Sequence, residues 1–185
     1  MPSPVGHALA GLAAGWLVQG TPPLSSKATW TREAALFGTL GVLPDVDLLF
    51  QAHSGPTHGV GAAALVGLVA FVVWPGQPAA RLRAALACAL AYSSHILLDW
   101  LGSDSSAPIG IMALWPLSRE YFESSFHVFM AISRRYWQGA AFWRQNLIAL
   151  ARELVILGPV LAAVVIARKR RGVAGLGHAR PKVGP

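Results

Sequence analysis

Long apolar runs separated by short polar segments dominate the chain. Five runs are long enough to form helices: residues 5–18, 34–43, 59–74, 84–101 and 147–167. Several are shorter than the roughly 20 residues that cross a bilayer comfortably. Their number, and the scarcity of charged residues between them, nevertheless favour lipid contact over a water-soluble core. We therefore predict an all-α fold, a small polytopic membrane helical bundle.

The segments between the runs carry residues that end helices. Pro and Gly interrupt residues 20–31, 43–58 and 74–83, which we predict to be loops. Residues 102–146 are more polar and rich in Trp and Tyr, which is typical of a membrane–water interface. We expect an interfacial loop and an amphipathic helix there.

The composition supports a membrane location. Apolar residues make up 54% of the 185 residues and charged residues only 12%, against about 25% charged in an ordinary soluble domain. The length fits one domain, which we place at residues 1–167. The single cysteine, Cys88, excludes an intrachain disulfide and a cysteine-based zinc site.

The net charge of +7 is concentrated near the end of the chain. Residues 168–171 are all Lys or Arg, and residues 168–185 are predicted to form a basic, disordered tail. Such a tail can bind nucleic acid, but directly after an apolar run it is more typical of a cytoplasmic anchor. We predict a multi-pass protein of the inner (plasma) membrane with a cytoplasmic tail. Residues 44–58 lack Lys and Arg, so we expect them on the other side.

Histidine and aspartate residues lie next to the ends of the predicted helices. If the first and second runs form one hairpin and the third and fourth runs form another, the helix ends that carry these residues meet at one end of the bundle. His95 and Asp99 are four residues apart and share a helix face. An aspartate inside a membrane helix costs about 2.5–3.5 kcal/mol, so it normally has a partner and a function. The candidate ligands are His7, Asp45, Asp47, His58, His95 and Asp99, with His53 as a weaker one.

Imidazole and carboxylate groups together are ligands for Zn²⁺, Mn²⁺ or Fe²⁺. We predict one or two divalent ions, zinc first, with Asp45 and Asp47 as candidates for the catalytic base or a bridging ligand. A divalent ion acidifies water and polarises a phosphoryl oxygen, which favours phosphoester hydrolysis. Simpler interpretations remain open. His95 and Asp99 could form a structural hydrogen bond, and Asp45 could be a turn residue after Pro44.

The order and spacing of these residues resemble a known family. Gly6 and His7, the segment Leu-Pro-Asp-Val-Asp at residues 43–47, His53 and His58, and His95 and Asp99 are followed by Trp-Pro-Leu-Ser at residues 115–118. This series is similar to the YdjM-type inner-membrane metal-dependent hydrolases, also called LexA-binding. The resemblance covers about residues 5–120.

The resemblance implies metal-binding roles for Asp45, His58, His95 and Asp99, with His7 as a further ligand. That family is in turn distantly similar to zinc-dependent phospholipase C, a helical enzyme that binds a zinc cluster through His and Asp. This sequence has no second pair of the form His-x-x-x-Glu. A full three-metal cluster is therefore not expected.

The resulting prediction is a membrane-bound metal-dependent hydrolase whose substrate is a small-molecule or lipid phosphoester. The protein itself is expected to contact membrane lipid. One alternative is a non-catalytic membrane regulator that binds a protein partner through its basic tail. A metal-ion transporter with the same ligands would need a polar path through the bilayer. Residues 59–74 offer none, so we rank it lower.

Overall fold

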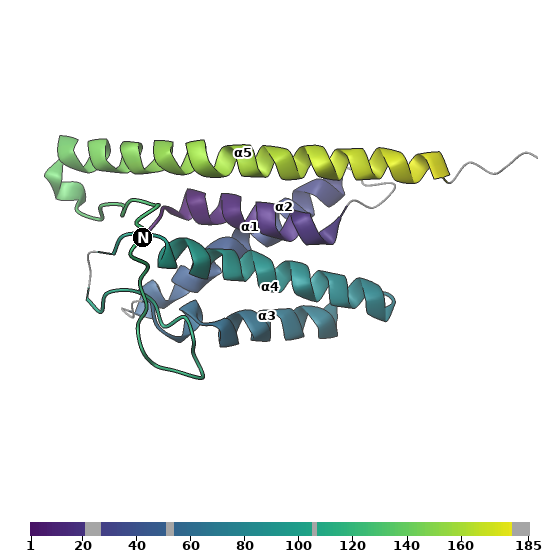
Figure 1. Cartoon of the computed structure of the whole chain (residues 1–185), viewed down its shortest axis with the longest axis horizontal. Coiled ribbons are helices and arrows are strands. Elements are labelled where there is room, and N and C mark those ends of the chain that lie inside the picture. Colours follow the sequence, from purple (N-terminus) through teal and green to yellow (C-terminus); the bar gives the residue numbers. More distant parts are fainter. Residues whose placement is uncertain (21–26, 51–53, 105–106, 179–185) are drawn as a thin grey trace, which may run out of the picture.

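The structure, a computed structural model, describes residues 1–20, 27–50, 54–104 and 107–178, the last seven without their side chains. Within these residues it is all-helical and contains no β-strand, which confirms the all-α prediction. The helices lie side by side, with α5 on one outer side and α3 on the other (Figure 1). They are α1 (Pro4–Gln19), α2 (Lys27–Val42), η1 (Leu43–Phe50), η2 (Pro56–His58), α3 (Val60–Val73), α4 (Pro78–Trp100), η3 (Tyr136–Gln138) and α5 (Ala140–His178).

Helices α1 and α2 form the first predicted hairpin, and glycines allow them to approach closely. A Cβ atom on Gly11 would lie only 2.8 Å from the Cα atom of Gly41, so neither position has room for a side chain. One turn along α1, Gly15 faces the ring of Phe37, which is fully buried. This contact fixes the register of α1 against α2.

Helices α3 and α4 form the second hairpin. Arg81, in the first turn of α4, donates hydrogen bonds to the carbonyl oxygens of Phe71 (2.9 Å) and Val72 (2.6 Å), near the end of α3. Arg81 therefore caps the C-terminus of α3. Helix α4 is central, since it packs against α1, α2 and α3. Its buried face carries small residues such as Ala87 and Ala91, which bring the neighbouring helices close.

Helix α5 packs along α1 and is tied to the N-terminal helices at two places. The buried carboxylate of Glu153 accepts hydrogen bonds from the backbone N–H of Ser3 (2.6 Å) and from its hydroxyl. Further along α5, Arg168 pairs with Glu33 of α2, and its guanidinium lies 4.4 Å from the ring centre of Trp30. Both ties are buried, so α5 is an integral part of the bundle.

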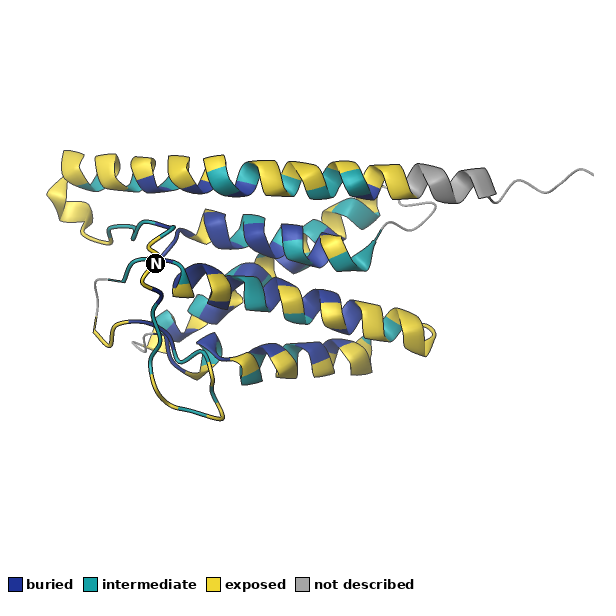
Figure 2. Ribbon diagram, in the orientation of Figure 1, coloured by how far each residue is buried: buried dark blue, intermediate teal, exposed yellow. Residues whose placement is uncertain are grey.

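Among the described residues, α5 is the one helix that is long and apolar enough to cross a membrane. The span Ala140–Arg171 contains an 18-residue window with a mean hydropathy of 2.1. Helix α3 is also apolar but has only 14 residues. Exposed residues nevertheless lie along several helices (Figure 2), and many of them are apolar, such as Leu65, Leu86 and Val155. The prediction of several membrane spans remains a prediction.

The segment between α4 and α5 is mostly a loop. We predicted an interfacial loop and an amphipathic helix within residues 102–146; the described residues up to 135 form a loop with two isolated β-bridges, and the helical residues of this segment belong to η3 and to the first turns of α5. Pro108 and Pro116 interrupt helical hydrogen bonding there. Ile111 and Phe129 are buried, so this segment folds back over one end of the bundle.

Helix boundaries also differ from the apolar runs. Helices α2, α4 and α5 begin six or seven residues earlier, because polar residues with good helix propensity extend a helix beyond its apolar part. Helix α5 continues to His178, so residues 168–178 are helical and not part of a disordered tail. Residues 179–185 of that predicted tail lie outside the described residues.

Candidate metal centre

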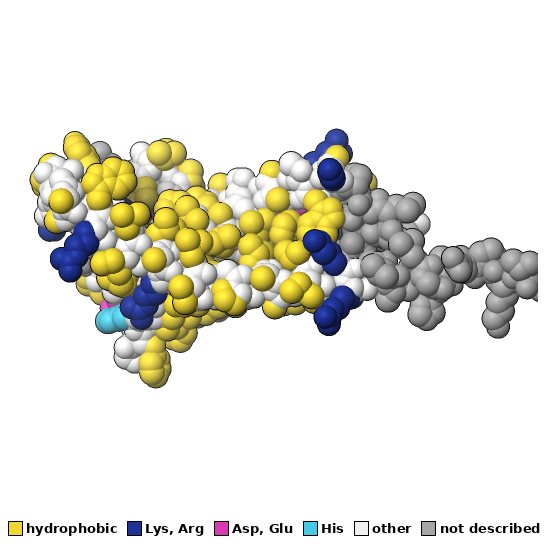
Figure 3. Space-filling view, turned by 90° about the horizontal axis from the view of Figure 1, so that it is seen from above, with side chains coloured by type: hydrophobic (Ala, Val, Ile, Leu, Met, Phe, Trp, Pro, Cys, Tyr) yellow, Lys and Arg dark blue, Asp and Glu magenta, His cyan; other side chains and the backbone are white. Residues whose placement is uncertain are grey.

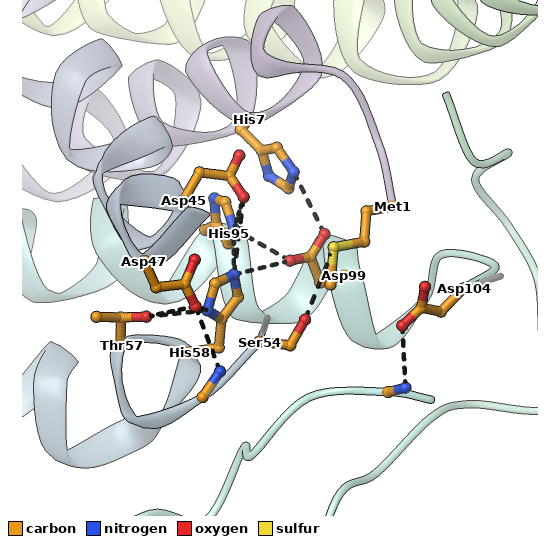
Figure 4. Close-up of polar contacts among 12 residues, drawn as sticks. Met1, His7, Asp45, Asp47, Ser54, Thr57, His58, His95, Asp99 and Asp104 are labelled. Atoms are coloured by element: carbon orange, nitrogen blue, oxygen red, sulfur yellow. Dashed lines mark hydrogen bonds and ion pairs between the residues drawn. The ribbon is translucent and has the colours of Figure 1, made fainter. Parts of the chain in front are cut away.

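The start of α1, the region around η1 and η2, and the second half of α4 meet at one end of the bundle (Figure 1). Their side chains bring six of the predicted ligands into one group (Figure 4). The seventh, His53, lies outside the described residues. The group consists of His7, Asp45, Asp47, His58, His95 and Asp99.

Four of these side chains direct one donor atom each toward a common region. The Nε2 atoms of His58 and His95 are 3.1 Å apart. The Oδ2 atom of Asp99 lies 3.0 Å from Nε2 of His95 and 3.4 Å from Nε2 of His58. The Oδ1 atom of Asp45 lies 3.7 and 3.8 Å from the same two nitrogens. A tetrahedral zinc ion with bonds of about 2.0–2.1 Å separates its ligands by about 3.3 Å, close to these distances.

The fifth residue, His7, extends the cluster on the other side of Asp99. Its ring stacks on that of His95, with centroids 3.7 Å apart, and its Nε2 atom lies 3.3 Å from Oδ1 of Asp99. The two oxygens of Asp99 therefore face different histidines. A carboxylate in this position can bridge two ions, and groups that include His7 or Asp45 could each hold one. The number of ions stays a prediction.

The orientation of His95 is fixed by the backbone of α2. Its Nδ1 atom lies 2.8 Å from the carbonyl oxygen of Gly41. Because a carbonyl oxygen only accepts, Nδ1 carries the hydrogen, and Nε2 presents its lone pair to the cluster. A ring nitrogen bound to an acceptor in this way is the usual support of a metal-binding histidine.

Asp47 supports His58 in the same way. Its Oδ2 atom lies 3.2 Å from Nδ1 of His58 and accepts hydrogen bonds from the Thr57 hydroxyl (3.1 Å) and the Gly55 N–H (3.3 Å). Asp47 is absent from the groups of converging ligand atoms. The geometry therefore favours a positioning role for Asp47 behind His58.

The cluster carries more carboxylates than cations. Burial alone would lower the pKa of His58, but the nearby carboxylates of Asp45, Asp47 and Asp99 raise it to about 11. Burial would raise the pKa of Asp45, yet the interaction with His58 and the charge of the other nearby histidines lower it. The site thus favours a bound cation, which can be a proton or a metal ion.

Several buried polar atoms have no hydrogen-bond partner among the described residues. They include both ring nitrogens of His7 and both carboxylate oxygens of Asp99, whose contacts with each other and with His58 and His95 are ion pairs and not hydrogen bonds. Buried polar groups are nearly always satisfied, since an unsatisfied one costs free energy. A metal ion would satisfy these donors, so the residues present fit the ion that their chemistry implies.

The model of the YdjM inner membrane protein family matches residues 1–171. The chain belongs to the YdjM family. The match runs from α1 through most of α5 and extends well beyond the sequence resemblance, which covered about residues 5–120. No curated protein and no solved structure matches the chain, so the expected similarity of the YdjM family to zinc-dependent phospholipase C gains no support.

Two supporting residues in this YdjM family member escaped the sequence analysis. Glu153 holds Ser3, whose hydroxyl accepts from the N–H of Gly6 and so caps the helix that carries His7. A signal existed, because Glu153 is the one acidic residue in the apolar run 147–167. The role of Gly41 depends on a backbone carbonyl oxygen, which residue type does not reveal.

Proposed function

We propose that this protein is a membrane-bound metal-dependent hydrolase that acts on a phosphoester or lipid-like substrate. The observation that carries the proposal is the buried convergence of three histidines and two aspartates, with a third aspartate behind them. Clusters of His and Asp side chains that contact mainly one another are typical of catalytic metal sites. Membership of an inner membrane family supports a location of this chemistry at a bilayer.

Each residue has a role in this proposal. His58, His95, Asp99 and Asp45 would hold a divalent ion, zinc first, and His7 would bind on the other oxygen of Asp99. When bound, the ion acidifies water and polarises a phosphoryl oxygen. Asp45 is the most exposed carboxylate of the cluster, and we assign to it the proton of the attacking water. Asp47 holds the ring of His58 in place.

We further propose that the bundle crosses the membrane several times. Leucines of α4 at positions 82, 86, 90 and 97 expose about half their surface on the outer face of the bundle. One face of the molecule shows apolar side chains over its middle and Lys or Arg toward both ends (Figure 3). The C-terminal part of α5 lies at the end opposite the metal centre (Figure 1). A cytoplasmic tail would therefore place the site on the far side of the membrane.

The test is metal content and activity of the whole protein purified in detergent. We expect bound zinc in the wild type and a loss of most of it in His95→Ala and Asp99→Asn. His127→Ala is a matched control, because this histidine is exposed in the loop at the same end. Equal metal content in all four proteins would overturn the proposal. Metal binding without hydrolysis of any phosphoester would favour the non-catalytic regulator.

A further inference from the structure

The metal centre is closed on all sides but one. His7, His58, His95, Asp99 and Asp47 are buried. Asp45 differs, since 19% of its side chain is exposed. Among the described residues of the cluster, it therefore offers the route by which a substrate reaches the ligands.

Asp45 forms part of the wall of an open groove of about 590 Å³ between α1, α2 and η1. This volume is within the range of about 300–1,000 Å³ that is typical of small-molecule sites. The lining includes Ala8 of α1, Gly38 of α2, and Val46 and Leu49 of η1. Apart from Asp45, the one polar side chain in the groove is that of Thr39.

The lining excludes a strongly polar occupant. It contains no Lys or Arg to bind a free phosphate and, apart from Thr39, no side chain to bind sugar hydroxyls. Polar groups placed against such a surface would lose water without gaining hydrogen bonds, which is costly. A hydrocarbon chain has the opposite preference. The groove therefore matches the apolar part of an amphipathic molecule.

We propose that this groove binds an acyl chain of a membrane phospholipid, whose phosphoester then lies at Asp45. The inference rests on the proposed function and narrows its substrate to lipids. Leu49 is 79% exposed and continues the apolar surface outward. The lipid would enter sideways from the bilayer and not from water.

A second apolar groove provides a matched control. It measures about 390 Å³, lies among α2, α3 and α4, and is lined by residues such as Leu65 and Val69. No residue of the metal centre lines it. Lipid that merely surrounds the protein would contact both grooves whatever its head group. Binding of a substrate lipid would depend on the head group, and only in the groove at Asp45.

Gly38 is the position at which to fill the groove. A Cβ atom at this position would lie 4.0 Å from its nearest neighbours, which are side-chain atoms of Ala8 and Leu12. A side chain at position 38 therefore starts without a steric clash. The ring in Gly38→Phe would occupy the groove, and Val69→Phe would fill the control groove. Neither residue belongs to the proposed metal centre.

The test uses photo-crosslinking of the full chain in nanodiscs. One probe is phosphatidic acid with a diazirine in its acyl chain, and the other is diacylglycerol with the same chain. We expect phosphatidic acid to label residues 45–49, of which Asp45, Val46 and Leu49 line this groove and none lines the control groove, at least about tenfold more than diacylglycerol does. The two probes differ only in the phosphate, and a phosphate contact worth about 1.4 kcal/mol gives a tenfold ratio. Gly38→Phe should remove the excess and Val69→Phe should not.

Equal labelling by the two lipids, or an excess that persists in Gly38→Phe, would overturn the inference. Zinc content is measured on the same samples. A wild-type protein that contains no zinc would count against the proposed function. A wild-type protein that contains zinc but is labelled equally by the two lipids would count against the groove alone.

Discussion

His95 of α4 donates its Nδ1 hydrogen to the carbonyl oxygen of Gly41 in α2, at 2.8 Å. This single bond joins the two predicted hairpins at the candidate metal centre. It also sets the tautomer of His95, so that Nε2 faces His58 and Asp99. The close approach of α1 and α2 thus has a chemical result, because it positions the acceptor for a candidate ligand.

The first prediction concerns Gly41→Ala. A Cβ atom there would overlap the backbone carbonyl of His7 and lie 3.1 Å from the Cα atom of Gly11. Backbone atoms cannot move away cheaply, so α1 and His7 should shift. We expect zinc affinity to fall by about 10–100-fold, as for other losses of ligand support. Calorimetric titration with zinc measures it. Gly38→Ala is the control, and equal affinities in the two variants would refute the prediction.

The second prediction concerns Glu153→Gln. One carboxylate oxygen that accepts from Ser3 would be replaced by an amide NH₂ group, which donates. We expect a loss of roughly 2 kcal/mol of stability, the magnitude of a buried hydrogen bond to a charged group. Thermal unfolding in detergent measures this. Zinc affinity should also fall, since Ser3 caps the helix that carries His7. Glu120→Gln, in an exposed loop, should change neither quantity.

The third prediction concerns pH. In the metal-free protein the pKa of His58 is about 11, so the ring is protonated at neutral pH. Zinc must displace that proton, and its affinity should rise about tenfold per pH unit from pH 7 to 9. The pKa values of Asp45 and Asp47 are lowered, so they stay ionised and add no slope. An affinity that is constant over this range would contradict the assignment of His58 as a ligand.

The same shift affects the stability of the metal-free protein. Because folding raises the pKa of His58 above its ordinary value of 6.5, the stabilisation is complete below pH 6.5 and disappears as the pH rises toward 11. Unfolding midpoints in the presence of a chelator should therefore fall with rising pH. His58→Ala should remove this part of the dependence.

The fourth prediction concerns orientation. In a Cys88→Ser background, Glu120→Cys should react with a membrane-impermeant maleimide in intact cells, because the exposed loop lies at the metal-centre end. Arg171→Cys, at the other end of the bundle, should react only after permeabilisation. The reverse pattern would place the metal centre on the cytoplasmic side.

The sequence pattern was sufficient for the helices and for the convergence of the candidate ligands. Apolar runs identify the parts of helices that face lipid or neighbours, and two hairpins of similar length return His7, His58 and Asp99 to one end. Helix ends were missed because polar residues extend helices without changing the apolar pattern. The fold of residues 102–135 was missed because a Trp-rich polar composition does not distinguish an interfacial helix from a loop that packs back on the bundle.

Within the site, the division of roles could not be predicted. Asp45 and Asp47 are two residues apart and look equivalent in the sequence, yet one faces the cluster and the other lies behind His58. Their side chains separate because η1 is a 3₁₀ helix, whose three residues per turn point them in different directions. The contact of Glu153 with Ser3 joins residues 150 positions apart: the isolated acid indicates that Glu153 has a partner, but nothing local indicates which residue it is.

The two ties of α5 have a practical consequence for biochemistry. Deleting the most hydrophobic helix is a common way to obtain a water-soluble fragment of a membrane enzyme. Here that truncation would remove Arg168, the partner of Glu33, and Glu153, the partner of Ser3. The carboxylate of Glu33 would then lie between helices without its ion-pair partner, which is destabilising. We therefore expect a fragment that lacks α5 to be unstable, and functional work should use the intact polypeptide in a lipid-like environment.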